Sequence, residues 1–283
     1  MKILVVGLGL IGGSICKGLK KYTSHTVIGS DLNKVVEEAA KADGSVDEIF
    51  DGSFNDYDLV ILCLYPEASE KYFRNHAGLM RSGTLVTDVC GIKGDFSQRM
   101  KEIASDHNIE YIGIHPMAGK EFGGYANSSS DLFVRANFII TPFNGSDVTK
   151  ISILRSLAEE LGAGKIVVTT PDAHDKMIAY TSQLAHIVSS AYVKSPELEL
   201  ECGFSGGSFQ DMTRIATMNE FMWTDLFMQN SENLKYELDL LIENLKKYSS
   251  ALEKKDSETM ENLIRDGRKL KEQNLRRRIG QPN

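Results

Sequence analysis

The amino-acid sequence predicts an α/β fold in which a doubly wound sheet is followed by an all-helical domain. Short apolar strand patterns alternate with helical patterns up to about residue 168, as is typical of a parallel sheet covered by helices. After TPD (residues 170–172), which resembles a helix start with proline at its first position, the strand patterns stop and helical periodicity continues. We therefore expect two domains, 1–168 and 169–283.

The first turn of the predicted sheet carries a glycine motif. A strand at residues 2–6 runs into GLGLIG (residues 7–12), and a helical pattern follows. Gly7 permits the tight turn, Gly9 lets the backbone approach a pyrophosphate, and Gly12 lets the helix pack close to its strand. Because N–H groups at a helix start bind phosphates, the motif predicts a Rossmann-type dinucleotide site. Its expected cofactor-binding residues are Gly7, Leu8, Gly9, Leu10, Ile11 and Gly12.

The second predicted strand (residues 25–30) ends at Asp31, where an acidic side chain meets the adenosine ribose in such folds. The carboxylate repels a 2′-phosphate, so the sequence favours NAD over NADP; the alternative is that Asp31 only caps the helix starting near Lys34. Leu64, which ends the strand at 59–64, is a further cofactor-binding candidate. The remaining strands are expected at 84–87, 111–113, 138–141 and 165–168.

Composition excludes several functional classes. The net charge of −7 argues against nucleic-acid binding, and the basic cluster at Arg276, Arg277 and Arg278 is interpreted as a solvated tail. The four cysteines have neither C-x-x-C nor metal-ligand spacing, so we expect no metal and a reducing compartment. With no signal-peptide pattern and no apolar run of the roughly 18 residues that span a bilayer, we expect a soluble, cytoplasmic protein with no membrane contact.

The helical domain contains a long apolar stripe. Its members recur at four- and three-residue spacing, which places them on one helix face. The stripe either packs within the monomer or forms the core of a homodimer, and we favour the homodimer. The residues are Leu234, Leu238, Leu241, Leu245, Tyr248 and Leu252.

Three residues are candidates for chemistry. A strand runs into His115-Pro116, and ligands of open α/β sheets bind beyond carboxyl strand ends, so His115 is the catalytic candidate. Arg214 follows a capping-box pattern and either pairs with Asp211 or binds a substrate carboxylate. His186 lies among apolar residues, and its pattern alone favours the core.

Five segments together resemble the prephenate/arogenate dehydrogenase family of tyrosine biosynthesis, over nearly the whole chain to about residue 250. They are GLGLIGGS (7–14), DVCGIKG (88–94), HPMAGKE (115–121), TSQLAH (181–186) and GGSFQDMTRIA (206–216). The resemblance implies that His115 takes the proton of the ring hydroxyl while hydride leaves the same carbon for nicotinamide, after which the ring carboxylate departs as CO2. It also implies that Arg214 binds a substrate carboxylate and that His186 lines the same pocket.

The expected activity is therefore NAD-dependent prephenate dehydrogenase, with arogenate as the alternative substrate. Lys93 or Lys120 is expected to supply a cation for the dianionic substrate, and Glu121 either pairs with Arg214 or faces solvent. Two rival interpretations are another NAD-linked hydroxyacid dehydrogenase, which would use a lysine as its acid/base group, and a catalytically silent NAD sensor.

The chain departs from the family pattern at two positions. Gly91 replaces a frequent serine whose hydroxyl hydrogen-bonds within the site, and Lys120 replaces a frequent threonine. At position 91 either water or Cys90 compensates, or the hydrogen-bond network around His115 differs.

Overall fold

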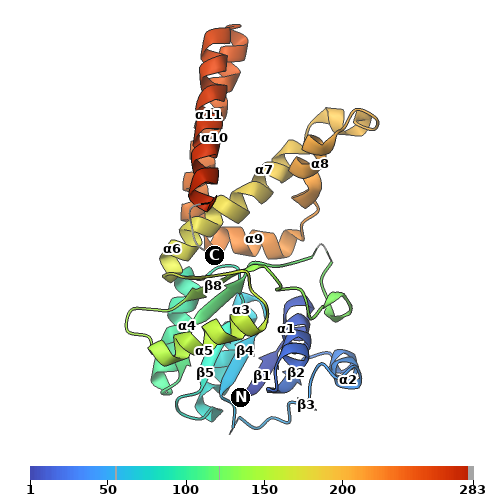
Figure 1. Cartoon of the computed structure of the whole chain (residues 1–283), viewed down its shortest axis with the longest axis vertical. Helices are drawn as coiled ribbons and strands as arrows, with labels where there is room; N and C mark the ends of the chain where they lie inside the picture. The colour runs from blue at the N-terminus through green and yellow to red at the C-terminus, as the bar shows by residue number, and fades with distance from the viewer. Residues whose placement is uncertain (55, 121, 280–283) are drawn as a thin grey trace. The chain divides into compact units, whose positions relative to one another are not determined.

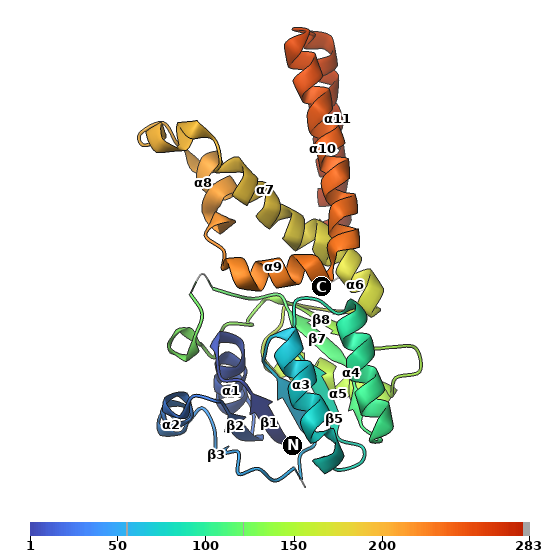
Figure 2. The same cartoon turned by 180° about the vertical axis from the view of Figure 1, so that it is seen from behind.

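The computed structural model describes all of the chain except residues 55, 121 and 280–283 and the side chains of residues 278 and 279 (Figures 1 and 2). The expectation for Glu121 therefore lies outside the described residues. The chain divides into two compact units, Met1–Asp175 and Lys176–Asn283, and the division falls inside helix α6 (Pro171–Ile178).

The first unit contains a six-stranded sheet in the order β3-β2-β1-β4-β5-β6, with every pair parallel. This order confirms the predicted doubly wound sheet, whose direction of growth reverses between β1 and β4. Both of these central strands are apolar and almost wholly buried, as expected when helices cover both faces. The strands are β1 (Lys2–Val6), β2 (Thr26–Ser30), β3 (Glu48–Ile49), β4 (Leu59–Leu62), β5 (Leu85–Asp88) and β6 (Glu110–Tyr111).

Helices lie on both faces of this sheet. α1 contacts α5 and α3 contacts α4, and Figure 2 shows α3 and α4 on the face turned away from α5. The inward side chains of α1 and α5 join those of β1 and β4 in one apolar core that includes Ile3, Ile15, Ile61 and Leu157. The helices are α1 (Leu10–Tyr22), α2 (Lys34–Ala42), α3 (Pro66–His76), α4 (Gly94–Asp106) and α5 (Val148–Glu160), with short 3₁₀ turns at Ala77–Leu79 and Tyr125–Asn127.

A second sheet was not predicted. The strand expected at 111–113 is interrupted at Ile112, whose N–H still bonds the Val86 carbonyl, and the chain then continues as β7 (Gly113–Pro116). β7 pairs antiparallel with β8 (Asn137–Thr141), and β8 pairs parallel with β9 (Lys165–Val168). The crowded junction requires glycine, because a Cβ on Gly113 would lie 2.8 Å from Thr141 Oγ1 and 3.0 Å from Asp88 Oδ2.

The second unit is helical, as predicted. A π-helical turn, η3 (Ala179–Gln183), follows α6 directly, and the helix then continues as α7. α10 and α11 pack against each other (Figure 1), and the Tyr248 hydroxyl donates to the Leu263 carbonyl. The helices are α7 (Leu184–Tyr192), α8 (Gly207–Thr213), α9 (Glu220–Gln229), α10 (Ser231–Glu253) and α11 (Ser257–Ile279), with 3₁₀ turns η4 (Pro196–Leu200) and η5 (Arg214–Ala216).

The predicted apolar stripe on α10 is covered only in part. Leu234 is buried against Ala179 and Leu184, whereas Leu245 and Leu252 are 56% and 68% exposed. Arg276 and Arg277, expected in a tail, are instead exposed residues of α11. No helix among the described residues is long and apolar enough to cross a membrane.

Candidate active site

The dinucleotide turn is built by close backbone approach. Gly7 has φ +90°, and a Cβ there would lie 2.6 Å from the Cys63 carbonyl oxygen. A Cβ on Gly12 would lie 1.9 Å from the Gly7 oxygen, so α1 starts directly against β1. Gly9 has no atom within 4 Å of its Cβ position and caps α1 without a side-chain hydrogen bond. The turn therefore presents open backbone and the N-terminus of α1.

Asp31 is fixed beside this turn. Its Oδ2 accepts the Leu8 N–H at 2.7 Å and its Oδ1 accepts the Asn33 N–H at 2.9 Å. The side chain that caps α2 is that of Asn33, which accepts the Val35 N–H, so the capping alternative for Asp31 is wrong. Because Asp31 occupies the Leu8 N–H, Leu8 holds this carboxylate in place rather than offering a phosphate donor.

The remaining cofactor candidates surround the same turn. Leu10 and Ile11 form the first residues of α1, and the Leu64 side chain lies near Gly7, with its Cδ2 2.8 Å from the Cβ position there.

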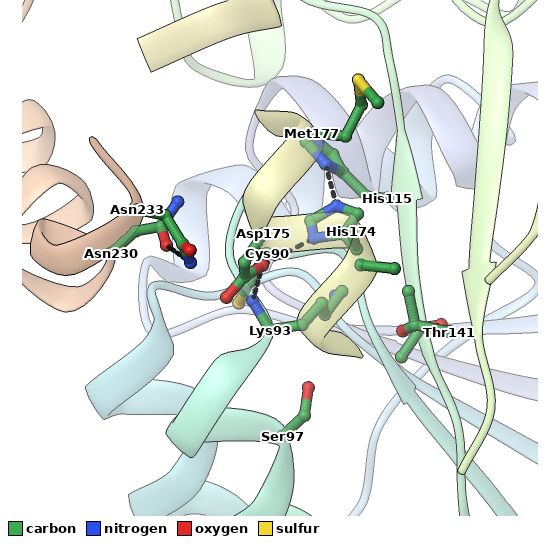
Figure 3. Close-up of polar contacts among 12 residues, drawn as sticks. Cys90, Lys93, Ser97, His115, Thr141, His174, Asp175, Met177, Asn230 and Asn233 are labelled. Atoms are coloured by element: carbon green, nitrogen blue, oxygen red, sulfur yellow. Dashed lines mark hydrogen bonds and ion pairs between the residues drawn. The ribbon is translucent and has the colours of Figure 1, made fainter. Parts of the chain in front are cut away.

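Two histidines and an aspartate form a chain of hydrogen bonds in the first unit (Figure 3). His115, on β7, has its Nδ1 2.9 Å from His174 Nε2, and His174 Nδ1 lies 2.7 Å from Asp175 Oδ1. A carboxylate accepts only, so His174 donates from Nδ1 and accepts at Nε2 from His115 Nδ1–H. The Nε2 atom of His115 then carries a lone pair and is a proton acceptor.

Electrostatics keep this pair of rings neutral. Burial lowers the pKa of His115 well below its usual value, and the nearby His174 and Lys93 lower it further. Burial also lowers the pKa of His174, although its hydrogen bond to Asp175 opposes the shift. A neutral His115 is in the protonation state that a general base requires.

The Lys93 side chain is buried, although it was expected to contact the substrate. Its side chain is 0% exposed, and its ammonium lies 2.6 Å from Asp88 Oδ1 and 2.7 Å from the Ile114 carbonyl oxygen. With these partners, the Lys93 ammonium is enclosed inside the fold and is not exposed to a substrate in this structure. Lys120 is exposed and donates to the Asn127 carbonyl at 2.7 Å.

Gly91 leaves space beside the catalytic candidate. A Cβ at this position would lie 3.8 Å from both Cε1 and Nε2 of His115, which is ordinary van der Waals contact. The Cys90 thiol is directed elsewhere, at the Leu64 carbonyl oxygen 3.5 Å away. Cys90 therefore does not replace the hydroxyl that is frequent at position 91 in the family.

His186 in the second unit is half-buried rather than a core residue. Its ring stacks on Trp223 with centroids 3.7 Å apart, and its Nδ1 donates to the Ser182 carbonyl at 2.9 Å. Burial lowers the pKa of His186, and the positive charge of Arg214 lowers it further. The π-helical turn immediately before α7 sets the direction of this ring, and such turns are frequent at functional sites.

Arg214 is exposed and lies in η5, one residue beyond the helix on which it was expected. Within the described residues, no hydrogen bond or ion pair joins it to Asp211. Among the described residues, no carboxylate forms an ion pair with the guanidinium. No described group of His, Cys, Asp and Glu side chains could hold a metal ion.

Sequence reasoning did not identify His174 and Asp175 as site residues. The local signal is the His-Asp pair in the first turns of the helix after Pro171, and only the fold brings it to His115, 59 residues earlier.

Comparison with known proteins shows to which family the chain is similar. Residues 15–168 match the family model "Prephenate dehydrogenase, nucleotide-binding domain", and residues 170–266 match "Prephenate dehydrogenase, dimerization domain". A prephenate dehydrogenase of Lactococcus lactis is 29% identical over 281 residues, covering 96% of this chain and 77% of the relative.

Two solved structures cover almost the entire chain. Synechocystis arogenate dehydrogenase has a TM-score of 0.82 and 26% identity, with 96% of this chain and 99% of that chain covered. Prephenate dehydrogenase from A. aeolicus, in complex with hydroxyphenyl propionate and NAD+, has a TM-score of 0.84 and 25% identity, with 98% of both chains covered. The two matched domains together span most of the sequence, and the chain therefore belongs to the prephenate and arogenate dehydrogenase family of oxidoreductases.

Proposed function

We propose that this protein catalyses the NAD-dependent oxidative decarboxylation of prephenate to 4-hydroxyphenylpyruvate, CO2 and NADH. The observation that carries the proposal is the series of hydrogen bonds from His115 through His174 to Asp175, which leaves the lone pair of His115 on Nε2. The lowered pKa of His115 keeps that lone pair available. A neutral imidazole with one fixed acceptor nitrogen is suited to take a hydroxyl proton.

The chain's own groups support a binding site for NAD. The Gly7 turn, the open backbone at Gly9 and the uncapped start of α1 fit a pyrophosphate, with Leu10 and Ile11 contributing N–H groups. Asp31 at the end of β2 receives the ribose hydroxyls and repels a 2′-phosphate, which favours NAD over NADP. Leu8 and Leu64 shape the apolar wall of this turn.

His115 acts on the ring hydroxyl of the substrate. Its Nε2 takes the proton as the hydroxyl-bearing carbon becomes a ketone and loses its hydride, for which bound NAD supplies the acceptor. The bond to the ring carboxylate then breaks, its electron pair completes the aromatic ring, and the proton returns to the phenolate oxygen. Formation of the aromatic ring makes the reaction effectively irreversible.

Arg214 and His186 bind the substrate. The exposed Arg214 guanidinium offers a bidentate pair of donors to a carboxylate. His186, stacked on Trp223, presents Nε2 as its remaining hydrogen-bonding atom. Arogenate carries an amino acid in place of the keto acid of prephenate, and the likeness to Synechocystis arogenate dehydrogenase makes it the second candidate substrate.

We further infer a homodimer formed through the helical unit. The match to a dimerization domain supports it, as do the exposed apolar side chains Leu240, Leu245 and Leu252 on α10. Sedimentation equilibrium of the purified protein tests this inference, and a monomer at micromolar concentration contradicts it.

The function is tested by following NADH absorbance with prephenate and arogenate in parallel, using wild type and His115→Asn. We expect NADH with prephenate and a large loss of rate in the variant. NADH formed with arogenate but not with prephenate would show that arogenate is the substrate. No NADH with either compound would reject the proposed activity. Full activity in the variant would reject the role of His115.

A further inference from the structure

A buried ion pair lies next to the histidine pair and is not used by the proposed reaction. Lys93 and Asp88 are both 0% exposed, with Lys93 Nζ 2.6 Å from Asp88 Oδ1. Taking two charges out of water is costly, and replacing a buried ion pair by apolar side chains of the same size often leaves stability unchanged or raises it. The pair therefore calls for a role beyond stability.

Lys93 forms hydrogen bonds with both segments that carry the histidines. Its ammonium donates to the carbonyl of Ile114, the residue directly before His115 on β7, at 2.7 Å. Its backbone N–H donates to Asp175 Oδ1 at 2.8 Å, and the same oxygen accepts from His174 Nδ1. Figure 3 shows Lys93 at the end of this series, followed by Asp175, His174 and His115.

Asp88 fixes the other side of Lys93. Besides the ammonium, its Oδ1 accepts the Cys90 N–H at 2.7 Å and its Oδ2 accepts the Tyr111 hydroxyl at 2.6 Å. Gly113 leaves the space that this arrangement needs, since a Cβ there would lie 3.0 Å from Lys93 Cδ. The ammonium is consequently held in one position, between Asp88 and the Ile114 carbonyl of β7.

We propose that the Lys93–Asp88 pair is a positioning unit for the histidines: it fixes β7 at Ile114 and α6 at Asp175 in one geometry, so that His115 Nδ1 meets His174 Nε2. This inference rests on the proposed role of His115 as the base. Lys93 and Asp88 touch neither substrate nor cofactor in this role and act through His115 and Asp175.

The charges of the unit act on the same rings. Lys93 lowers the pKa of both histidines, whereas Asp175 and Asp88 raise that of His174. Removing the ammonium is therefore expected to raise the pKa of His115 towards its usual value. Because the base works only when deprotonated, the acid limb of kcat/KM then moves to higher pH.

The test compares Lys93→Met, the double variant Lys93→Met/Asp88→Asn and the control Lys71→Met. The single variant leaves the Asp88 carboxylate buried without its cation and is at risk of not folding, whereas the double variant removes both charges and keeps the packing. The control makes the same substitution at an exposed lysine of α3.

Three measurements on these variants separate positioning from stability. In the double variant we expect NAD affinity, measured by calorimetry, within about twofold of wild type and kcat reduced about tenfold or more, the scale of a misplaced base. The ring resonances of His115, in protein carrying 13C-labelled histidine, are expected to titrate at higher pH than in wild type. The control is expected to match wild type throughout.

The proposal is overturned if the double variant keeps wild-type kcat and the wild-type His115 titration. It is also overturned if kcat falls only in proportion to NAD affinity and unfolding stability. The ring titration needs no turnover, so a wild-type protein without dehydrogenase activity rejects the proposed function while the positioning of His115 by Lys93 is still tested.

Discussion

Replacing His174 by phenylalanine is the most direct perturbation of the proposed base. The substitution keeps a planar ring in a site that is 1% exposed, but it removes the acceptor for His115 Nδ1–H and the donor to Asp175. Asp175 keeps the N–H of Lys93. Losing one neutral hydrogen bond and one to a carboxylate predicts a stability loss of about 2–4 kcal/mol.

The effect on catalysis is expected to exceed the effect on folding. Without His174, the proton of His115 is free to occupy Nε2, and the ring is free to turn, so the base is absent in part of the molecules. We predict a fall in kcat of about 10²- to 10⁴-fold, the usual contribution of a positioned general base.

The assay combines steady-state NADH formation with denaturant unfolding. The matched control is His107→Phe, at an exposed position that caps the end of α4, and it is expected to keep wild-type kcat. Rates are taken well below the denaturation midpoint of the variant. If His174→Phe loses stability but keeps kcat within about threefold, His174 does not position the base and the reasoning is refuted.

Four further predictions follow from the site. For wild type, kcat/KM should fall with decreasing pH only below about 6.5, because the pKa of His115 is lowered and the base is active when deprotonated; a pH–rate profile with an acid limb above that value contradicts this. Asp31→Ala should weaken NAD binding about tenfold and reduce discrimination against NADP, and unchanged calorimetric affinities would disprove the ribose contact. Gly91→Ser should fold with a midpoint near that of wild type because its Cβ would make only an ordinary van der Waals contact with His115, at 3.8 Å; a large loss in thermal unfolding temperature would show that the side chain does not fit. Arg214→Lys should raise KM for prephenate more than it lowers kcat, since the bidentate contact is lost, and an effect on kcat alone would argue against carboxylate binding.

The parts of the fold that depend on local spacing were predictable from the sequence. The glycine turn and the strand ending at Asp31 follow from residues a few positions apart, because backbone geometry dictates them. The second sheet was not predictable in this way. Whether residues 113–116 continue one sheet or join another depends on the partner strand β8, which lies more than twenty residues later in the sequence.

The site was predictable only where a residue's neighbours in sequence reveal its environment. His115 at a strand end met that condition. Lys93, in a short loop between a strand and a helix, has the pattern of an accessible cation, and only the fold shows that Asp88 and Ile114 enclose it. The bond from His174 to His115 joins distant segments and has no counterpart in local pattern.

The π-helical turn Ala179–Gln183 has a consequence for sequence change along this helix. A π turn holds one residue more than an α turn, so deleting a single residue there could restore a regular helix without a break. Within a regular α-helix, each residue removed rotates everything downstream by about 100°. At the π turn the shortened segment closes as an ordinary α turn instead, so the helix beyond it keeps its rotation and His186 stays on the face that meets Trp223. A one-residue deletion is thus absorbed at this turn, whereas the same deletion within α7 redirects the helix face beyond it.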